Sequence, residues 1–114
     1  MKDCLFCRIL RREIPAKFIY QDDEVSAFAD MNPQAPTHCL VIPNLHLSTL
    51  NEIDDGNRAL AGKLISVAVQ IAKDKGLAEK GYRLVANCQA AAGQSVFHVH
   101  FHLMGGRSFD WPPG

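Results

Sequence analysis

The chain has 114 residues, a length that suits one domain over residues 1–114 and leaves little room for a second. Hydrophobic residues make up 47% of the chain and charged residues 21%, which excludes a disordered or collagen-like protein. Twelve basic and twelve acidic side chains cancel, so the chain lacks the positive field with which proteins bind nucleic acids or acidic membranes non-specifically.

The beginning of the chain has no apolar run of signal-peptide length, and no stretch approaches the roughly 20 residues needed to cross a bilayer. Of the four cysteines, Cys4 and Cys7 form a C-x-x-C pair, whereas Cys39 and Cys88 stand alone in apolar, strand-like settings. A chain with an adequate core gains little from disulfides. We therefore expect reduced thiols and a cytoplasmic protein.

The first half of the chain reads as one short helix and three strands. Apolar residues at helical spacing predict an amphipathic helix over 4–12, which must end before Pro15. Strands are expected at 18–21 and 25–29, joined by a polar turn. The prolines of segment 32–36 exclude a helix or a central strand there, and strand character resumes over 38–42.

The second half predicts one long helix and two further strands. The helix should run from about 57 to 75, with Gly76 as its C-terminal cap and an apolar stripe formed by Leu60, Leu64, Val67, Ala68 and Ile71. The strands should cover 82–88 and 96–104, the second ended by a Gly-Gly pair. Strands that follow one another with few helical crossovers favour an α+β fold. We expect a five-stranded antiparallel sheet with one long and one short helix.

The last strand carries an unusual run of histidines. If 96–104 is extended, His98, His100 and His102 share one face at about 6–7 Å spacing. The opposite face, formed by Phe97, Val99, Phe101 and Leu103, would pack on the long helix. Three neighbouring imidazoles cannot all be protonated at little cost. At least one should therefore stay neutral and nucleophilic near pH 7.

Three interpretations of this histidine row are open: a catalytic metal site, nucleophilic attack by an imidazole, or a polar face without chemistry. The preceding loop supplies neutral hydrogen-bond donors, Asn87 and Ser95, which suit a phosphate ester. No acidic residue lies near the row in the sequence to hold a catalytic metal or activate its water. These features favour direct attack by a histidine.

The segment from His98 to Met104 matches the histidine-triad pattern H-φ-H-φ-H-φ-φ, in which φ is hydrophobic. Further matching segments are EIPAK (13–17), NPQAPTH (32–38), VIP (41–43), GYRLVAN (81–87), GQSVFHVHFH (93–102), GGR (105–107) and WPPG (111–114). Over nearly its whole length the chain resembles the Hint branch of the histidine-triad (HIT) family, the purine nucleoside phosphoramidases. The resemblance implies a HIT-like fold. It also implies hydrolysis of purine nucleoside 5′-phosphoramidates or acyl-nucleotides through a covalent nucleotidyl-histidine.

The resemblance also implies roles for single residues. His100 would be the nucleophile, while His102 and His38 would orient it and tune its protonation. Asn87 and Ser95 would hold the phosphate and the leaving group, and Asp30 would accept hydrogen bonds from the ribose. The apolar pocket for the base would be formed by Phe6, Ile9, Ile14 and Phe28.

A metal and a second copy of the chain are further expectations from the resemblance. Several bacterial members of the family carry a structural zinc with two cysteines and two histidines, which Cys4, Cys7, His46 and His98 would supply here. The alternative is a reduced cysteine pair packed in a short helix, with His46 an ordinary loop residue. The family is homodimeric, and two five-stranded sheets form one of ten strands. The C-terminal tail with Trp111 would then reach toward the partner's active site. No organic cofactor is expected.

Two other functions are kept as alternatives. One is hydrolysis of dinucleoside polyphosphates, as in the Fhit branch of the same family, against which the GGR segment and the tail argue. The other is a nucleotide-binding regulatory or scaffold protein whose catalysis is incidental.

Overall fold

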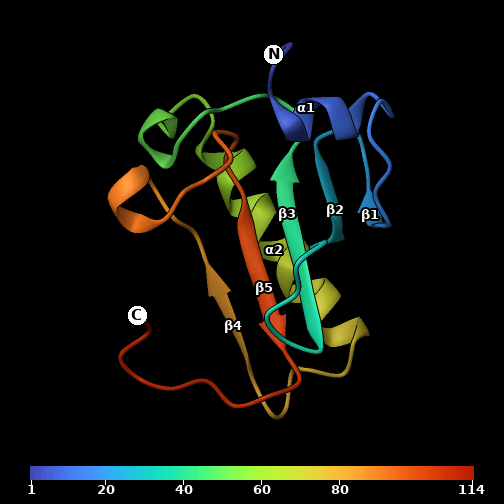
Figure 1. The fold of residues 1–114 in the computed structure, drawn as a ribbon, viewed down its shortest axis with the longest axis vertical. Coiled ribbons are helices and arrows are strands. Elements are labelled where there is room, and N and C mark those ends of the chain that lie inside the picture. The colour runs from blue at the N-terminus through green and yellow to red at the C-terminus, as the bar shows by residue number, and fades with distance from the viewer.

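The computed structural model describes residues 1–114, and a five-stranded sheet forms its centre. In chain order the strands are β1 (Phe18–Gln21), β2 (Val25–Ala29), β3 (Thr37–Pro43), β4 (Tyr82–Val85) and β5 (Phe101–Gly105). In space they follow the order β1-β2-β3-β5-β4, and every neighbouring pair is antiparallel (Figure 1). The predicted α+β fold is confirmed.

Two helices of unequal length cover the two faces of the sheet. The long helix α2 (Arg58–Asp74) crosses behind the sheet in Figure 1, and the short helix α1 (Leu5–Leu10) lies at one end of β2 and β3. The larger core lies between the sheet and α2. A smaller core on the other face consists of Phe6, Ile9, Phe28, Leu40 and Ile42. Alternation along β2 and β3 thus gives the sheet two apolar faces.

Helix α2 agrees with its prediction to within one residue at each end. Leu64, Val67, Ala68 and Ile71 of the predicted stripe are buried, as is Ala72, while Leu60 in the first turn is partly buried. The helix ends at Asp74 and is followed by Gly76, whose φ of 74° lies in the left-handed region that glycine enters without steric cost.

The two strands of the second half are shorter than predicted. β4 ends at Val85 and β5 begins only at Phe101, so residues 96–100 lie outside the ladder. In the β3–β5 register Val41 faces Phe101, and continuing the ladder would bring Val99 opposite Pro43. Pro43 has no N–H to donate to the Val99 carbonyl, and its own carbonyl accepts the ring N–H of His98 at 2.8 Å. The Val99 N–H is donated instead to the carbonyl of Leu47 at 2.7 Å.

The early end of β5 also corrects the predicted apolar face. Val99 and Leu103 are buried in the larger core and Phe101 packs against it, as expected. Phe97 was expected there too, but it is 45% exposed because the backbone bends at 96–98. Neither helix of this fold is long and apolar enough to span a membrane.

Candidate active site and adjoining Cys/His cluster

The register of β3 and β5 brings two of the predicted residues together on the face that α1 covers. His102 lies opposite Leu40, and His38 lies opposite Met104, so the two histidines are diagonal neighbours. His38 Nε2 and His102 Nδ1 are 2.9 Å apart, a hydrogen bond. Residues 64 positions apart in the chain therefore form one unit.

Hydrogen bonds define the protonation of this pair. The main-chain N–H of Gln34 donates to His38 Nδ1 at 2.9 Å, so that nitrogen carries no proton and the His38 proton is on Nε2. His38 Nε2 donates to His102 Nδ1, which leaves the His102 proton on Nε2. Burial, and then the neighbouring His100 and His38, lower the pKa of His102 to about 4. His102 is therefore neutral at pH 7.

Asp30 joins the same unit, a contact that the sequence did not reveal. Its Oδ2 lies 3.2 Å from His38 Nε2 and 3.9 Å from His102 Nδ1, while its Oδ1 accepts the main-chain N–H of Asn32 at 2.8 Å. The carboxylate thus shares the His38 proton with His102. The turn at 30–32 holds it in that position.

His100 presents the opposite ring nitrogen to the site. Its Nδ1 lies 2.7 Å from the main-chain carbonyl of His98, which can only accept, so Nδ1 carries the proton. Nε2 is then left with its lone pair. Burial lowers the pKa of His100 more than this hydrogen bond raises it. The result is a neutral imidazole, 7% exposed, that can act as a nucleophile or base through Nε2.

A cavity of about 190 Å³ opens beside His100 and His102. Its walls are mostly apolar and include three of the four predicted base-pocket residues, Phe6, Ile9 and Phe28. Two predicted polar residues, Asp30 and Ser95, also line it. Its remaining lining residues are Leu5, Ala16, Ala29, Met31, Leu40 and Val96.

Two residues named from the sequence lie outside the cavity lining. Ile14 packs against the smaller core, behind the wall that Phe6 and Ile9 form. Asn87 is half-buried two residues after β4, and β4 ends before it reaches the cavity.

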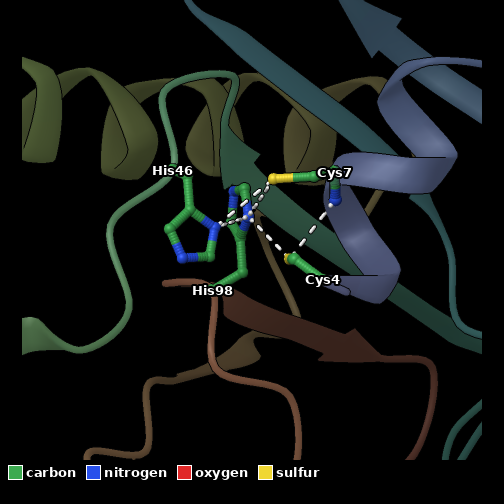
Figure 2. Close-up of side chains that lie close together, drawn as sticks. All are labelled: Cys4, Cys7, His46 and His98. Carbon is green, nitrogen blue, oxygen red and sulfur yellow. Dashed lines mark hydrogen bonds between the residues drawn. The ribbon is translucent and has the colours of Figure 1, made fainter. Parts of the chain in front are cut away.

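Next to this cavity, four metal-ligating side chains converge on one point. Cys4 and Cys7 come from the start of α1, His46 from the loop after β3, and His98 from the segment before β5 (Figure 2). Cys4 Sγ lies 3.4 Å and Cys7 Sγ 3.6 Å from His98 Nδ1. Cys7 Sγ lies 3.3 Å, and His98 Nδ1 3.2 Å, from His46 Nδ1.

These distances match the edges of a zinc tetrahedron. Zinc bonds of about 2.3 Å to sulfur and 2.05 Å to nitrogen place ligand sulfur and nitrogen atoms about 3.6 Å apart and two nitrogens about 3.3 Å apart. The main-chain carbonyl of Pro43 accepts the His98 Nε2 proton at 2.8 Å, which leaves Nδ1 free to bind a metal. Burial lowers the pKa of His98 to about 4, which keeps it in the neutral, ligating form. The cluster can hold a metal ion.

A second group, formed by Asp30, His38 and His102, also places three potential ligand atoms close together. Its shortest separations, 2.9 Å and 3.2 Å, both involve the His38 Nε2 proton and are explained by hydrogen bonds. We therefore interpret it as part of the active site and not as a metal site.

One residue that organises the site was not identified from the sequence. Gln94 is 5% exposed; its side chain accepts the N–H of Gln89 and donates to the carbonyls of Ser48 and Val96. It thereby ties the loop that carries Ser95 to the loop that carries His46. A single glutamine in a polar loop gives no periodic signal that could have predicted this.

Comparison with known proteins gives consistent results. A family model of the HIT domain matches residues 11–109. The chain is 48% identical over 106 residues to the purine nucleoside phosphoramidase of Escherichia coli (strain K12), covering 93% of this chain and 89% of the relative. A crystal structure of a HIT family hydrolase from Legionella pneumophila Philadelphia 1 has a TM-score of 0.96 at 46% identity, over 98% of this chain and 100% of that one. A histidine triad protein from Clostridium difficile has a TM-score of 0.92 at 40% identity, over 96% of both chains.

Proposed function

The chain belongs to the HIT domain family, and on that basis we propose that it hydrolyses purine nucleoside 5′-phosphoramidates or acyl-nucleotides. We infer that residues 1–114 form one HIT domain. The observation that carries the proposal is His100, a neutral imidazole that lines an apolar cavity and keeps the lone pair of Nε2 free. The 48% identity to a purine nucleoside phosphoramidase supports the choice of substrate class.

In the first step, His100 Nε2 attacks the α-phosphorus of the substrate. A bond forms between nitrogen and phosphorus, the bond from phosphorus to the amine or acyl oxygen breaks, and an amine leaving group takes up a proton. The product is a covalent nucleotidyl-histidine. Water then attacks the same phosphorus, releasing the nucleoside monophosphate and restoring the His100 imidazole.

His102, His38 and Asp30 position this chemistry. The hydrogen bonds from the Gln34 N–H to His38 Nδ1 and from His38 Nε2 to His102 Nδ1 leave the His102 ring with its proton on Nε2. The His100 and His102 ring centres are 5.0 Å apart, which supports a role for both rings at one phosphate. Asp30 also lines the cavity, where its carboxylate can accept the ribose hydroxyls.

The cavity walls support a nucleoside as the bound group. Phe6, Ile9 and Phe28 offer flat apolar surface for a purine, and the exposed Ser95 at the cavity offers a neutral hydroxyl to the phosphate or the leaving group. We assign Asn87 to the same phosphate side, where movement of its loop on binding would bring it in. Ile14 then acts from behind the wall.

We propose that the Cys4–Cys7–His46–His98 cluster holds a structural zinc. Four protein ligands leave no open position, so the ion would supply stability by joining α1 to the loops at 46 and 98, and it would not activate water. The thiols that such a site needs, and the unpaired Cys39 and Cys88, support a reducing compartment such as the cytoplasm.

We also propose that two chains form a dimer through β4. β4 is an edge strand of the sheet, and an unpaired edge of this kind pairs readily with a second chain. The C-terminal tail leaves the sheet on the β4 side (Figure 1), where Arg83 donates to the carbonyl of Asp110 at 2.8 Å. Trp111 is 83% exposed in the single chain, which suits a contact with the partner subunit near its leaving-group site.

A substrate panel on the wild-type chain and on His100→Ala tests the proposed activity. Adenosine 5′-phosphoramidate should be hydrolysed by the wild type, diadenosine polyphosphates should be poor substrates, and His100→Ala should be inactive while it still binds AMP. Rapid quenching followed by mass spectrometry should detect the wild-type chain with a covalently bound AMP group.

The same panel separates the alternatives. Preferential hydrolysis of diadenosine polyphosphates would assign the chain to the dinucleoside-polyphosphate branch. Nucleotide binding without turnover of any substrate would instead identify a binding or scaffold protein.

A further inference from the structure

One residue, His98, contacts both the Cys/His cluster and the candidate nucleophile, His100. His98 directs its ring to the cluster, while its main-chain carbonyl accepts the Nδ1 proton of His100 at 2.7 Å. The His98 ring is fully buried, and its other nitrogen is held by the carbonyl of Pro43. A shift of the His98 backbone caused by a change at the cluster would therefore move the carbonyl that orients His100.

A second connection runs through Phe6, which lies between the two cysteines in the sequence. Its ring contacts the ring of His98 edge-on at 5.9 Å between centres and the ring of His100 at 5.1 Å. It also packs edge-on against Phe28 at 5.4 Å and lines the cavity. One aromatic ring thus separates the cluster from the place where a base would bind.

The helix that carries Phe6 depends on side chains for its attachment. α1 has six residues, too few for a stable helix by itself, and its main-chain hydrogen bonds are made to residues near it in the chain. What joins it to the rest of the molecule is the burial of Phe6 and Ile9 and the convergence of Cys4 and Cys7 on His46 and His98. Without a metal, the apolar contacts and weak hydrogen bonds between the thiols and the histidines would remain.

We propose that the Cys/His cluster is a positioning device for the active site, so that metal loading and nucleotide binding reinforce each other through Phe6 and the His98 carbonyl. The proposal rests on the proposed function, because it concerns the same nucleotide site. The loaded cluster holds Phe6 against His100 and completes the cavity wall. In the stripped chain α1 is free to move, and both the wall and the orientation of His100 are loosened.

This coupling is reciprocal, which gives it a test that needs no turnover. If zinc increases the affinity for AMP by some factor, AMP must increase the affinity for zinc by the same factor. We expect a factor of about five or more, five being the lower end of the range that is typical of coupled binding sites. AMP affinity is measured by calorimetry with and without zinc, and zinc affinity by chelator competition with and without AMP.

Two variants separate coupling from general damage. Phe6→Leu keeps all four metal ligands and an apolar side chain but removes the ring edge. It should bind zinc, bind AMP more weakly, and reduce the coupling factor to the part that the His98 carbonyl carries. Leu10→Ala alters α1 at a partly buried position outside the cavity lining, and it should keep the factor of the wild type.

Where the stripped chain is too unstable for calorimetry, the rate of zinc release to excess chelator is measured on the loaded chain with and without AMP. AMP should slow release in the wild type, and should slow it less in Phe6→Leu. Equal affinities or release rates with and without the other ligand, or a chain that takes up no zinc, would overturn the proposal.

Failure of the proposed function remains distinguishable from failure of the coupling. If the chain binds no AMP, the proposed function is wrong and the coupling is read from the His100 ring by ¹⁵N NMR. Zinc removal should then shift the Nδ1 and Nε2 signals of His100 away from the single Nδ1–H form. Unchanged His100 signals would overturn the coupling.

Discussion

His98 and His100 are two residues apart, both buried, and both hydrogen-bonded to a main-chain carbonyl, yet they are prepared for different chemistry. In His98 the carbonyl of Pro43 takes the Nε2 proton, so Nδ1 is free and points at two thiols. In His100 the carbonyl of His98 takes the Nδ1 proton, so Nε2 is free at the wall of the cavity. The carbonyl within reach selects the tautomer, and the tautomer selects the role.

The residues around the two histidines also favour different chemistry, metal binding at His98 and proton transfer at His100. The His98 side is closed by cysteines, which favour a soft metal such as zinc. The His100 side is bordered by a carboxylate, two imidazoles and an apolar hollow, which favour proton transfer and the binding of an organic group. One histidine run therefore contributes to both the proposed active site and the proposed metal site, and mutations can test how far the two are separate.

The largest effect should come from comparing the same alanine substitution at His100 and at His98. His100→Ala should lower kcat by a factor of about 10⁴ or more, because no other group can form the covalent bond, while zinc content stays at the wild-type level. His98→Ala should lose the zinc. Turnover and metal content measured on the same preparations check this crossed pattern. Near-normal rates in His100→Ala would refute the assignment of the nucleophile.

Removal of the metal should have the second-largest effect, a loss of stability. At free zinc about 1,000 times its Kd, zinc binding stabilises the fold by about 4 kcal/mol. For a chain of this length that corresponds to a fall in Tm on the order of 15–25 °C after chelation. Cys4→Ser should show the same loss in calorimetry and metal analysis, whereas Cys88→Ser, outside the cluster, should not. An unchanged Tm and zinc content in Cys4→Ser would contradict the metal site.

Lowering the pH should lower the free energy of unfolding, because the half-buried His102 ring must take up a proton. Its pKa is about 4 when folded, against 6.5 for an unperturbed histidine, so the unfolded chain binds the extra proton between these pH values. The stability from this group is complete above pH 6.5 and is lost as the pH falls toward 4, by on the order of 3 kcal/mol.

Urea unfolding at a series of pH values, with chelator present throughout, measures this loss. His102→Gln should show a shallower dependence on pH than the wild type does. An equal dependence in both chains would assign the acid sensitivity to other groups.

Asp30→Asn should have a smaller effect, a loss of about tenfold in kcat/KM, because an amide replaces the charged acceptor beside His38. A 2′,3′-dideoxy substrate separates its two contacts. If Asp30 only binds ribose, the substitution should cost nothing with this substrate. If it also holds His38, part of the loss should remain.

Much of the fold could be read from the sequence because periodicity reports directly which face of an element is buried. The stripe from Leu64 to Ile71 located α2, and short strand-like runs bounded by a polar turn and by prolines located β2 and β3. The alternation of His98, His100 and His102 correctly indicated a shared face, since Phe6 contacts the first two rings and the cavity adjoins the last two. It overestimated the length of the strand, because one segment of sequence does not show which residues of a neighbouring strand will pair with it.

The sequence by itself determined the residue types of both sites and the elements that carry them, because these are local properties. The tertiary structure alone decided where the β5 ladder stops, since that depends on which residue, here Pro43, stands opposite Val99. It also decided the two tautomers and the Asp30–His38 contact, which depend on atoms placed within about 3 Å of each ring by segments distant in the chain. Cys4 meets His98 across 94 positions, a convergence that only the packing of α1 on the sheet produces.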